Sequence, residues 1–223
     1  MRTMPSIEID KAIAEYQTRF QRYGYSPKTL GWLKGKQDIR FDILSSFYNF
    51  TNKSILDIGC GFGDLYSFLS KKFGTFQYTG CDICDFLIKE GKTKFPEASF
   101  FHGDFLSLEF TQPIDWALAS GPFTYKFEEM DNYEFIYNTM SKAFSLVRDG
   151  LSFDFSSDKV DYQLDETFHA SPEKILSMAY SFSRNVILRS DYMPFEFSVF
   201  IFKDDKFDKD DTLFHKYKRE NIA

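Results

Sequence analysis

The sequence has few residues of the kinds that bind metals or form disulfides. It contains three cysteines, Cys60, Cys81 and Cys84, and three histidines in 223 residues. An odd number of cysteines gives no complete disulfide framework, and the Cys-x-x-Cys spacing of Cys81 and Cys84 has no second pair that would complete a zinc site. The histidines lack metal-ligand spacing as well. We therefore expect no bound metal, and a reducing compartment, the cytoplasm, for the protein.

The sequence also lacks an excess of basic residues and a long apolar run. Its 27 Lys and Arg stand against 33 Asp and Glu, which gives a net charge of −6 at pH 7. This balance disfavours nucleic acid as a partner, because nucleic-acid-binding domains present a basic face. Residues 1–10 contain no apolar run typical of a signal peptide or a membrane span, so we expect no membrane partner.

Aromatic residues, by contrast, are abundant: 28 Phe and 13 Tyr contribute to an aromatic fraction of 19%. Because aromatic side chains dominate buried area, we expect most of them in the core. Part of the surplus could line a pocket for a flat or apolar ligand. The chain is long enough for one sizeable domain with additional segments, and short for two.

Apolar periodicity predicts two N-terminal helices and then an alternation of strands and helices. The predicted helices cover residues 6–22, 28–48, 64–73, 85–94 and 128–147, and the predicted strands cover residues 54–58, 76–82, 98–102, 114–120 and 150–155. Alternation at this spacing is typical of βαβ units, which give a parallel sheet with right-handed crossovers.

The last third of the chain has a different pattern. Ser171 and Pro172 are typical of a helix start, and the helix should end near residue 182. Two extended runs follow, 184–191 and 195–203, with a connection too short for a parallel crossover, so they should pair antiparallel. We expect a helical lid over residues 1–50, a core domain over residues 51–203 and a charged tail over residues 204–223.

Three glycines follow the predicted strand 54–58 at alternate positions, Gly59, Gly61 and Gly63. In open α/β sheets, ligands bind beyond the carboxyl ends of the strands, where glycine lets the backbone approach a ligand closely. Dinucleotide sites use Gly-x-Gly-x-x-Gly. Here the third glycine comes one residue earlier, and Asp64 takes the place of the last one. A carboxylate there would repel a pyrophosphate and tolerate a cation, so the loop disfavours a dinucleotide oxidoreductase.

This loop resembles motif I of the class I S-adenosylmethionine-dependent methyltransferases, and three further segments are similar to that family's motifs in the same order. The four segments are residues 55–65, 78–83, 101–105 and 115–123. Residues 25–41 and 188–197 also resemble a bacterial subgroup of the family, so the likeness spans about residues 23–203. This resemblance does not indicate the substrate.

The resemblance implies a fold and a cofactor. The fold is α/β, a Rossmann-like doubly wound sheet of seven mostly parallel strands with an antiparallel C-terminal pair, to which the N-terminal helical lid is added. The cofactor is S-adenosylmethionine, with S-adenosylhomocysteine as the product. In the family, the acid equivalent to Asp82 accepts both ribose hydroxyls, the acid equivalent to Asp104 receives the adenine amine, and the next residue, Phe105, packs on the ring.

To these motif residues we add Arg40, whose guanidinium could hold the methionine carboxylate bidentately. The predicted cofactor-binding set is Arg40, Asp57, Gly59, Cys60, Gly61, Gly63, Asp64, Asp82, Ile83, Asp104, Phe105 and Ser120. Tyr125, shortly after the fourth strand, and His102, at the end of the third, are the candidate catalytic residues. A general base is needed only where the acceptor is protonated at working pH.

The predicted function is methyl transfer to an oxygen or nitrogen atom of a small-molecule acceptor, by a monomer or homodimer. One alternative is a nucleic-acid or protein methyltransferase. Against nucleic acid, the segment that begins at Ser120 lacks the Asp or Asn acceptor that amino-directed nucleic-acid enzymes carry there. The other alternative is a non-catalytic protein that binds S-adenosylmethionine and serves as a partner-binding module.

Overall fold

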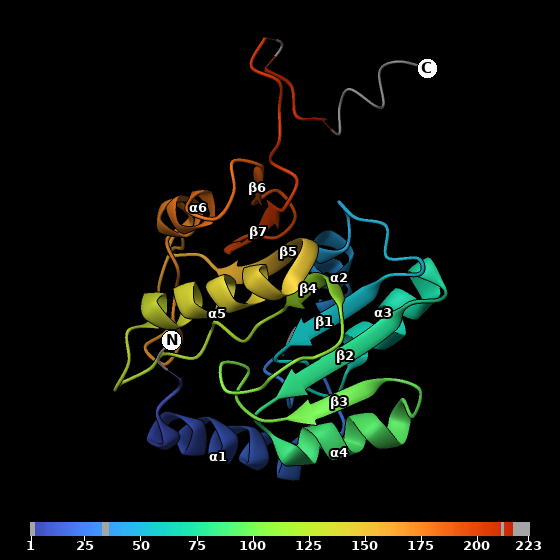
Figure 1. Ribbon diagram of the computed structural model, residues 1–223. Helices are drawn as coiled ribbons and strands as arrows, with labels where there is room; N and C mark the ends of the chain where they lie inside the picture. Colours follow the sequence, from blue (N-terminus) through green and yellow to red (C-terminus); the bar gives the residue numbers. More distant parts are fainter. Residues whose placement is uncertain (1–2, 33–35, 211, 216–223) are drawn as a thin grey trace.

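Seven strands form one sheet in the order β3-β2-β1-β4-β5-β7-β6 (Figure 1). The computed structural model describes residues 3–32, 36–210 and 212–215. Strands β1 to β5 pair in parallel, whereas β7 runs antiparallel to both β5 and β6. The predicted fold class is therefore confirmed. The strands are β1 Ser54–Ile58, β2 Gln77–Asp82, β3 Ser99–His102, β4 Ile114–Ala119, β5 Val147–Ser156, β6 Val186–Arg189 and β7 Glu196–Phe202.

Helices cover both faces of the sheet. They are α1 Ser6–Tyr23, α2 Gln37–Leu44, α3 Asp64–Phe73, α4 Asp85–Lys94, α5 Asn132–Leu146 and α6 Pro172–Tyr180. Helices α2, α3 and α4 pack on one face, and α5 and α6 pack on the other. Helix α1 lies beyond the sheet, at the end to which the arrows of β1 to β3 point (Figure 1). No helix among the described residues is long and apolar enough to span a membrane.

The central strand β1 shows why the apolar pattern identified the sheet so well. Leu56 and Ile58 are buried against the side of α5 and α6, and Ile55 is buried against the side of α2 and α3. A parallel strand covered on both faces has apolar residues pointing to both sides, and Ile55, Leu56 and Ile58 supply them here. The start of α6 is also as predicted, because the Ser171 side chain accepts a hydrogen bond from the backbone N–H of Lys174.

The second predicted helix, 28–48, is wrong in its bounds, because α2 covers only Gln37–Leu44. Before it, the backbone forms a turn in which the N–H of Trp32 donates to the carbonyl of Pro27, and Gly31 has a left-handed φ of 84°. A left-handed residue ends a helical run, whatever the spacing of its apolar neighbours. Residues 33–35 of this predicted helix, and residues 211 and 216–223 of the predicted tail, lie outside the described residues.

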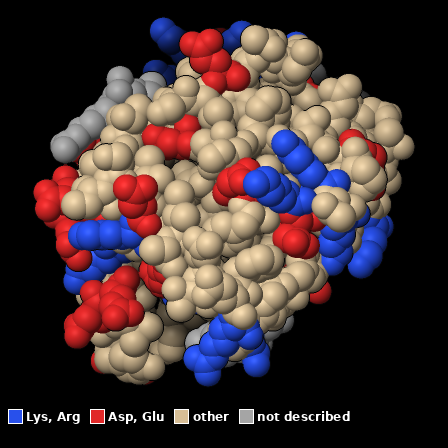
Figure 2. All heavy atoms as spheres, turned by 90° about the horizontal axis from the view of Figure 1, so that it is seen from below, with Lys and Arg blue, Asp and Glu red and all other residues tan. Residues whose placement is uncertain are grey.

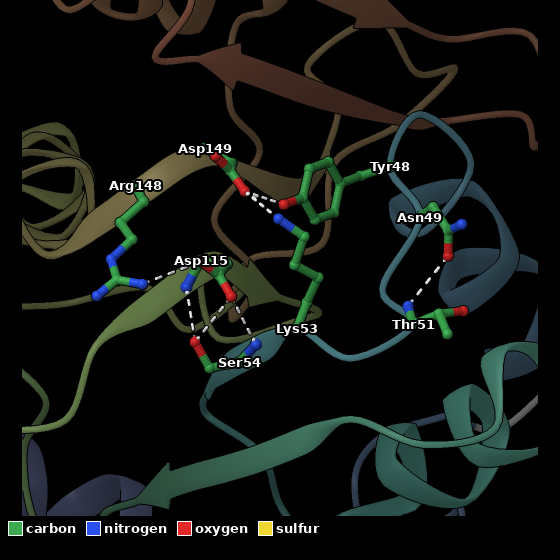
Figure 3. A network of polar contacts seen from close by, with 8 residues as sticks. All are labelled: Tyr48, Asn49, Thr51, Lys53, Ser54, Asp115, Arg148 and Asp149. Atoms are coloured by element: carbon green, nitrogen blue, oxygen red, sulfur yellow. Dashed lines mark hydrogen bonds and ion pairs between the residues drawn. The ribbon is translucent and has the colours of Figure 1, made fainter.

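Polar side chains hold the edge of the sheet at which β1, β4 and β5 begin (Figure 3). Asp149 accepts a hydrogen bond from the Tyr48 hydroxyl and forms an ion pair of 3.1 Å with Lys53. Asp115 accepts a hydrogen bond of 2.9 Å from the backbone N–H of Ser54. A cavity at this edge is lined by Tyr48, Lys53 and Asp149. These three groups already bind one another, which gives the network a structural role.

Candidate functional site

A cavity of about 1020 Å³, partly open to solvent, lies at the carboxyl ends of the central strands. The strand order reverses at this point, because β2 and β3 lie on one side of β1 and β4 lies on the other, and open α/β sheets bind ligands at such a reversal. Nine of the twelve predicted cofactor-binding residues line it: Asp57, Gly59, Cys60, Gly61, Asp82, Ile83, Asp104, Phe105 and Ser120. Arg40, Gly63 and Asp64 are not among the lining residues.

Packing against neighbouring side chains requires glycine at two positions of the glycine loop. Gly61 has a left-handed φ of 55°, and a Cβ atom there would come within 2.9 Å of the Leu30 side chain. Gly63, with a φ of 81°, directly precedes α3, and a Cβ there would come within 2.6 Å of Phe100. The third glycine is therefore required for packing behind the loop, which explains its absence from the lining.

Asp82, at the end of β2, both holds the glycine loop and faces the cavity. One carboxylate oxygen accepts a hydrogen bond of 2.9 Å from the N–H of Gly61, and the other accepts one of 2.8 Å from the N–H of Cys84. Burial raises the pKa of Asp82, although these two backbone donors oppose the rise. Each oxygen has a second lone pair, so the carboxylate can still accept hydrogen bonds from a ligand.

Asp104 lies on the other side of the cavity, after β3. Its Oδ1 accepts a hydrogen bond of 3.0 Å from the N–H of Leu106, and its Oδ2 accepts one of 3.2 Å from the N–H of Met4. The backbone before α1 thus binds directly to a predicted cofactor-binding carboxylate. Sequence reasoning did not find this contact, because it joins positions 100 residues apart.

The lid and the cavity meet at several points. Residues from the N-terminal segment that line the cavity are Met4, Ala12, Tyr16, Leu30, Trp32, Gln37 and Phe41. A Cβ atom at Gly121, in the loop after β4, would come within 2.7 Å of the Trp32 ring. Three aromatic residues of the N-terminal segment, Tyr16, Trp32 and Phe41, therefore reach the cavity.

Two of the sequence-predicted residues already have partners elsewhere. The Arg40 guanidinium stacks over the Trp32 ring at 4.0 Å and forms an ion pair with Glu196 at the start of β7. Gln37, one helical turn before Arg40, lines the cavity in its place. Asp64 accepts a hydrogen bond from the Tyr25 hydroxyl. Arg40 and Asp64 are thus not part of the cavity lining, and their roles in cofactor binding stay predictions.

The two candidate catalytic residues are placed differently. Tyr125 lines the cavity. Burial raises its pKa, and the Glu8 carboxylate adds to the rise. His102 is exposed at the end of β3, and its Nε2 lies 3.0 Å from the carbonyl oxygen of Ile83. It is not among the lining residues, so Tyr125 is the better placed of the two for contact with a ligand.

Two carboxyl groups at the cavity are buried: Asp57 is part of its lining, and Asp154 is not. Asp57 accepts a hydrogen bond of 2.6 Å from the Tyr78 hydroxyl. Asp154, on β5, accepts one of 2.6 Å from the Ser120 hydroxyl and one of 2.8 Å from the N–H of Gly121. Burial raises the pKa of each group to about 7. Within the described part of the chain, His, Cys, Asp and Glu form no group of three or more that could hold a metal ion.

These two pKa values make ligand-free stability depend on pH. Asp has an unfolded pKa of about 3.9, so between about pH 4 and pH 7 the folded state binds more protons than the unfolded state. Stability should therefore fall as pH rises through that window, by at most about 1.4 kcal/mol per pH unit for each group. In thermal melts, Asp154→Asn should flatten the fall, whereas Asp161→Asn, an exposed control, should not. Identical profiles for wild type and Asp154→Asn would contradict this.

The ionisable side chains in the described lining of the cavity include carboxyl groups but no basic group. Its described lining contains the carboxyl groups of Asp57, Asp82 and Asp104 and no Lys, Arg or His. On the face seen from below in Figure 2, acidic side chains gather on the side where α1 lies, and the Lys and Arg drawn there form separate groups among them. Such a site favours a neutral or cationic ligand over an anionic one.

Comparison with known proteins finds methyltransferases that are similar to part of this chain. Residues 55–150 match the sequence model of a family described as a methyltransferase domain. A protein of Mycobacterium tuberculosis that is named only provisionally as a methyltransferase, Rv1506c, is 26% identical over 156 residues, which are 67% of this chain and 93% of that protein.

Solved structures of low sequence identity share the fold. Magnesium protoporphyrin IX methyltransferase (ChlM) from Synechocystis PCC 6803, with bound S-adenosylhomocysteine, has a TM-score of 0.67 and 15% identity over 88% of this chain and 98% of its own. The pyocyanin biosynthetic protein PhzM has a TM-score of 0.65 and 11% identity over 84% of this chain and 61% of its own. At these identities the two likenesses show the fold alone.

Proposed function

We propose, on the premise that this chain is a class I S-adenosylmethionine-dependent methyltransferase, that it methylates an oxygen or nitrogen atom of a small-molecule acceptor. The matches to the methyltransferase-domain model and to the Mycobacterium tuberculosis protein support this premise and, with it, the predicted methyl donor. The acceptor class is supported by the character of the cavity, which is lined by aromatic side chains and by carboxyl groups. The observation that carries the proposal is this aromatic cavity, which adjoins the glycine loop and is lined in part by the N-terminal segment.

The residues of the cavity fit S-adenosylmethionine. The cofactor carries a sulfonium and an amino group, and carboxyl groups without a basic neighbour in the described lining suit such cations. Asp82 would hold the ribose hydroxyls through its unused lone pairs, and Asp104 with Phe105 would hold the adenine. Gln37 lies in the lining where Arg40 does not, which makes its amide the better candidate for the methionine end.

When bound, the cofactor supplies a methyl group on a sulfonium that is already a reactive leaving group. The chain has to bind the acceptor, orient it and exclude water. Tyr16 and Trp32 close the cavity from the lid side, and Tyr125 and Phe127 line it from the loop after β4. The Ser120 hydroxyl of the same loop already donates to Asp154, so the Tyr125 hydroxyl is the better suited of the two to orient an acceptor by a hydrogen bond.

The face in Figure 2 does not favour a nucleic-acid acceptor. A nucleic-acid methyltransferase should have a continuous basic groove leading to the cofactor site. The Lys and Arg drawn on this face are interspersed with Asp and Glu. Two basic residues on α1 and α4, Lys11 and Lys89, are paired with Glu128 and Asp85.

Binding and turnover can be tested in sequence. Calorimetry on the purified protein should show S-adenosylmethionine binding in the micromolar range, and S-adenosylhomocysteine should appear when a small-molecule extract is added. Asp82→Ala protein with the same extract is the control. Binding without any S-adenosylhomocysteine release would support the non-catalytic alternative. Release with a protein or RNA fraction alone would overturn the small-molecule proposal.

A further inference from the structure

A lysine on α5 binds the backbone of the loop that begins with Asp104 and Phe105. The Lys142 ammonium donates hydrogen bonds to the carbonyl oxygens of Phe105 at 2.8 Å and of Leu106 at 3.0 Å. It also donates to the carbonyl oxygen of Leu108. Because an ammonium has three N–H groups, these three carbonyl groups use all of its donors. The ammonium is therefore held at the point where the three carbonyl groups converge.

Residues 104–108 form a single backbone turn that is held at both ends. The N–H groups of Ser107 and Leu108 donate to the carbonyl oxygen of Asp104 at 2.9 Å and 3.1 Å. The N–H of Leu106 donates to the Asp104 side chain at 3.0 Å. The N–H groups of the turn thus bind Asp104, whereas its carbonyl groups bind Lys142. A single turn of backbone is marginal on its own, so its position depends on such contacts.

The same ammonium lies close to two residues of the cavity wall. It lies 5.1 Å from the centre of the Phe105 ring, which is within the range of a cation–π contact. Burial lowers the pKa of Lys142, and the Asp104 carboxylate makes the largest contribution that opposes the fall. Asp104 and Phe105 both line the cavity, and Lys142 does not. Lys142 can therefore act on a ligand only through these two residues.

We propose that Lys142 is a positioning residue for the adenine end of the cofactor, because it fixes the turn 104–108 from the side of α5. The inference rests on the proposed function, in which Asp104 accepts a hydrogen bond from the adenine amine and Phe105 packs on the ring. Without the ammonium, three carbonyl groups lose their donor and the turn is free to shift. The loss should then fall on recognition of the adenine amine rather than on the fold.

Lys142→Met removes the ammonium and keeps an unbranched side chain of similar length beside the Phe105 ring. Lys142→Gln is a second variant, which keeps N–H donors on a shorter and uncharged side chain. The matched control is Lys174→Met on α6, where the ammonium lies 4.6 Å from the centre of the Tyr133 ring. This control loses the same charge and the same kind of ring contact away from the turn. A thermal melt verifies that each variant is folded.

The ligands are S-adenosylhomocysteine and S-inosylhomocysteine, in which a carbonyl oxygen replaces the adenine amine, and calorimetry measures both affinities. Wild type should bind S-adenosylhomocysteine about tenfold or more tightly than S-inosylhomocysteine, because a hydrogen bond to a carboxylate is lost in the second ligand. Lys142→Met should weaken S-adenosylhomocysteine by about tenfold and S-inosylhomocysteine by no more than about twofold. Lys142→Gln should weaken S-adenosylhomocysteine less than Lys142→Met does, and Lys174→Met should change neither affinity.

A second background separates positioning from a general structural role. In Asp104→Ala protein the carboxylate that Lys142 positions is absent, so adding Lys142→Met should weaken S-adenosylhomocysteine by no more than about twofold further. The full tenfold loss in this background would contradict the proposal. Equal weakening of the two ligands by Lys142→Met in the otherwise wild-type protein would contradict it as well.

Wild-type affinity for S-adenosylhomocysteine in Lys142→Met, or a wild-type protein that does not distinguish the two ligands, would also overturn the assignment of Lys142. Failure of the proposed function has a different signature, because wild type would then bind neither ligand. Should Lys142→Met not fold, the same comparison of the two ligands in Lys142→Gln decides.

Discussion

Replacement of Asp82 by alanine is expected to weaken S-adenosylmethionine binding by about 100-fold or more. The carboxylate would accept two hydroxyl hydrogen bonds from the ribose, and charge-assisted bonds of this kind contribute about 1.5–3 kcal/mol each. The same carboxylate also accepts from the N–H groups of Gly61 and Cys84, so its removal frees the glycine loop as well. Both changes weaken cofactor binding, and neither removes an apolar side chain from the core.

Calorimetry with S-adenosylmethionine measures this effect, and a thermal melt verifies that the variant is folded. The matched control is Asp85→Ala, three positions further on, where the exposed carboxylate pairs with Lys89 in the first turns of α4. Its affinity for S-adenosylmethionine should stay within about twofold of wild type, as expected for a surface ion pair. An Asp82→Ala protein that is folded and binds as tightly as wild type would remove Asp82 from the cofactor site.

The sequence predicted the sheet well because its signals there are local. The strand Ser54–Ile58 and the helices Asp64–Phe73 and Asp85–Lys94 have the predicted bounds. The strand ends directly before a glycine, and each helix begins with an aspartate. Asp82 and Asp104 were placed by motifs in which the carboxylate follows a strand directly. Such motifs specify the end of the strand and the group that faces the ligand together.

The remaining features depend on contacts between distant segments. The sequence around Arg40 does not indicate which group its guanidinium binds. The fold brings it to Glu196, which is 156 positions away. The Glu8 carboxyl group likewise finds its partner far along the chain, because its Oε1 accepts a hydrogen bond from the N–H of Glu128, 120 positions away. The second helix was predicted too long because apolar spacing carries no signal for the left-handed Gly31. Local patterns cannot report any of these.

The second large effect concerns the lid. Its residues contact the cofactor loops at several points: the Met4 N–H binds Asp104, Leu30 fills the space beside Gly61, and Trp32 fills the space beside Gly121. A truncation that tests the lid should end before α2. Phe41, Leu44 and Phe50 are buried with Trp116 in the core, so removal of residues 1–50 would take out core packing as well. Removal of residues 1–32 leaves that cluster whole.

We expect the protein lacking residues 1–32 to lose S-adenosylmethionine affinity by about 100-fold or more, because water then reaches the sulfonium site and Tyr16 and Trp32 no longer line the cavity. Circular dichroism and a cooperative melt should show that the sheet stays folded. Removal of residues 209–223 at the other end of the chain is the control, and it should leave the affinity unchanged. Wild-type affinity in the protein without residues 1–32 would exclude the N-terminal segment from the cofactor site.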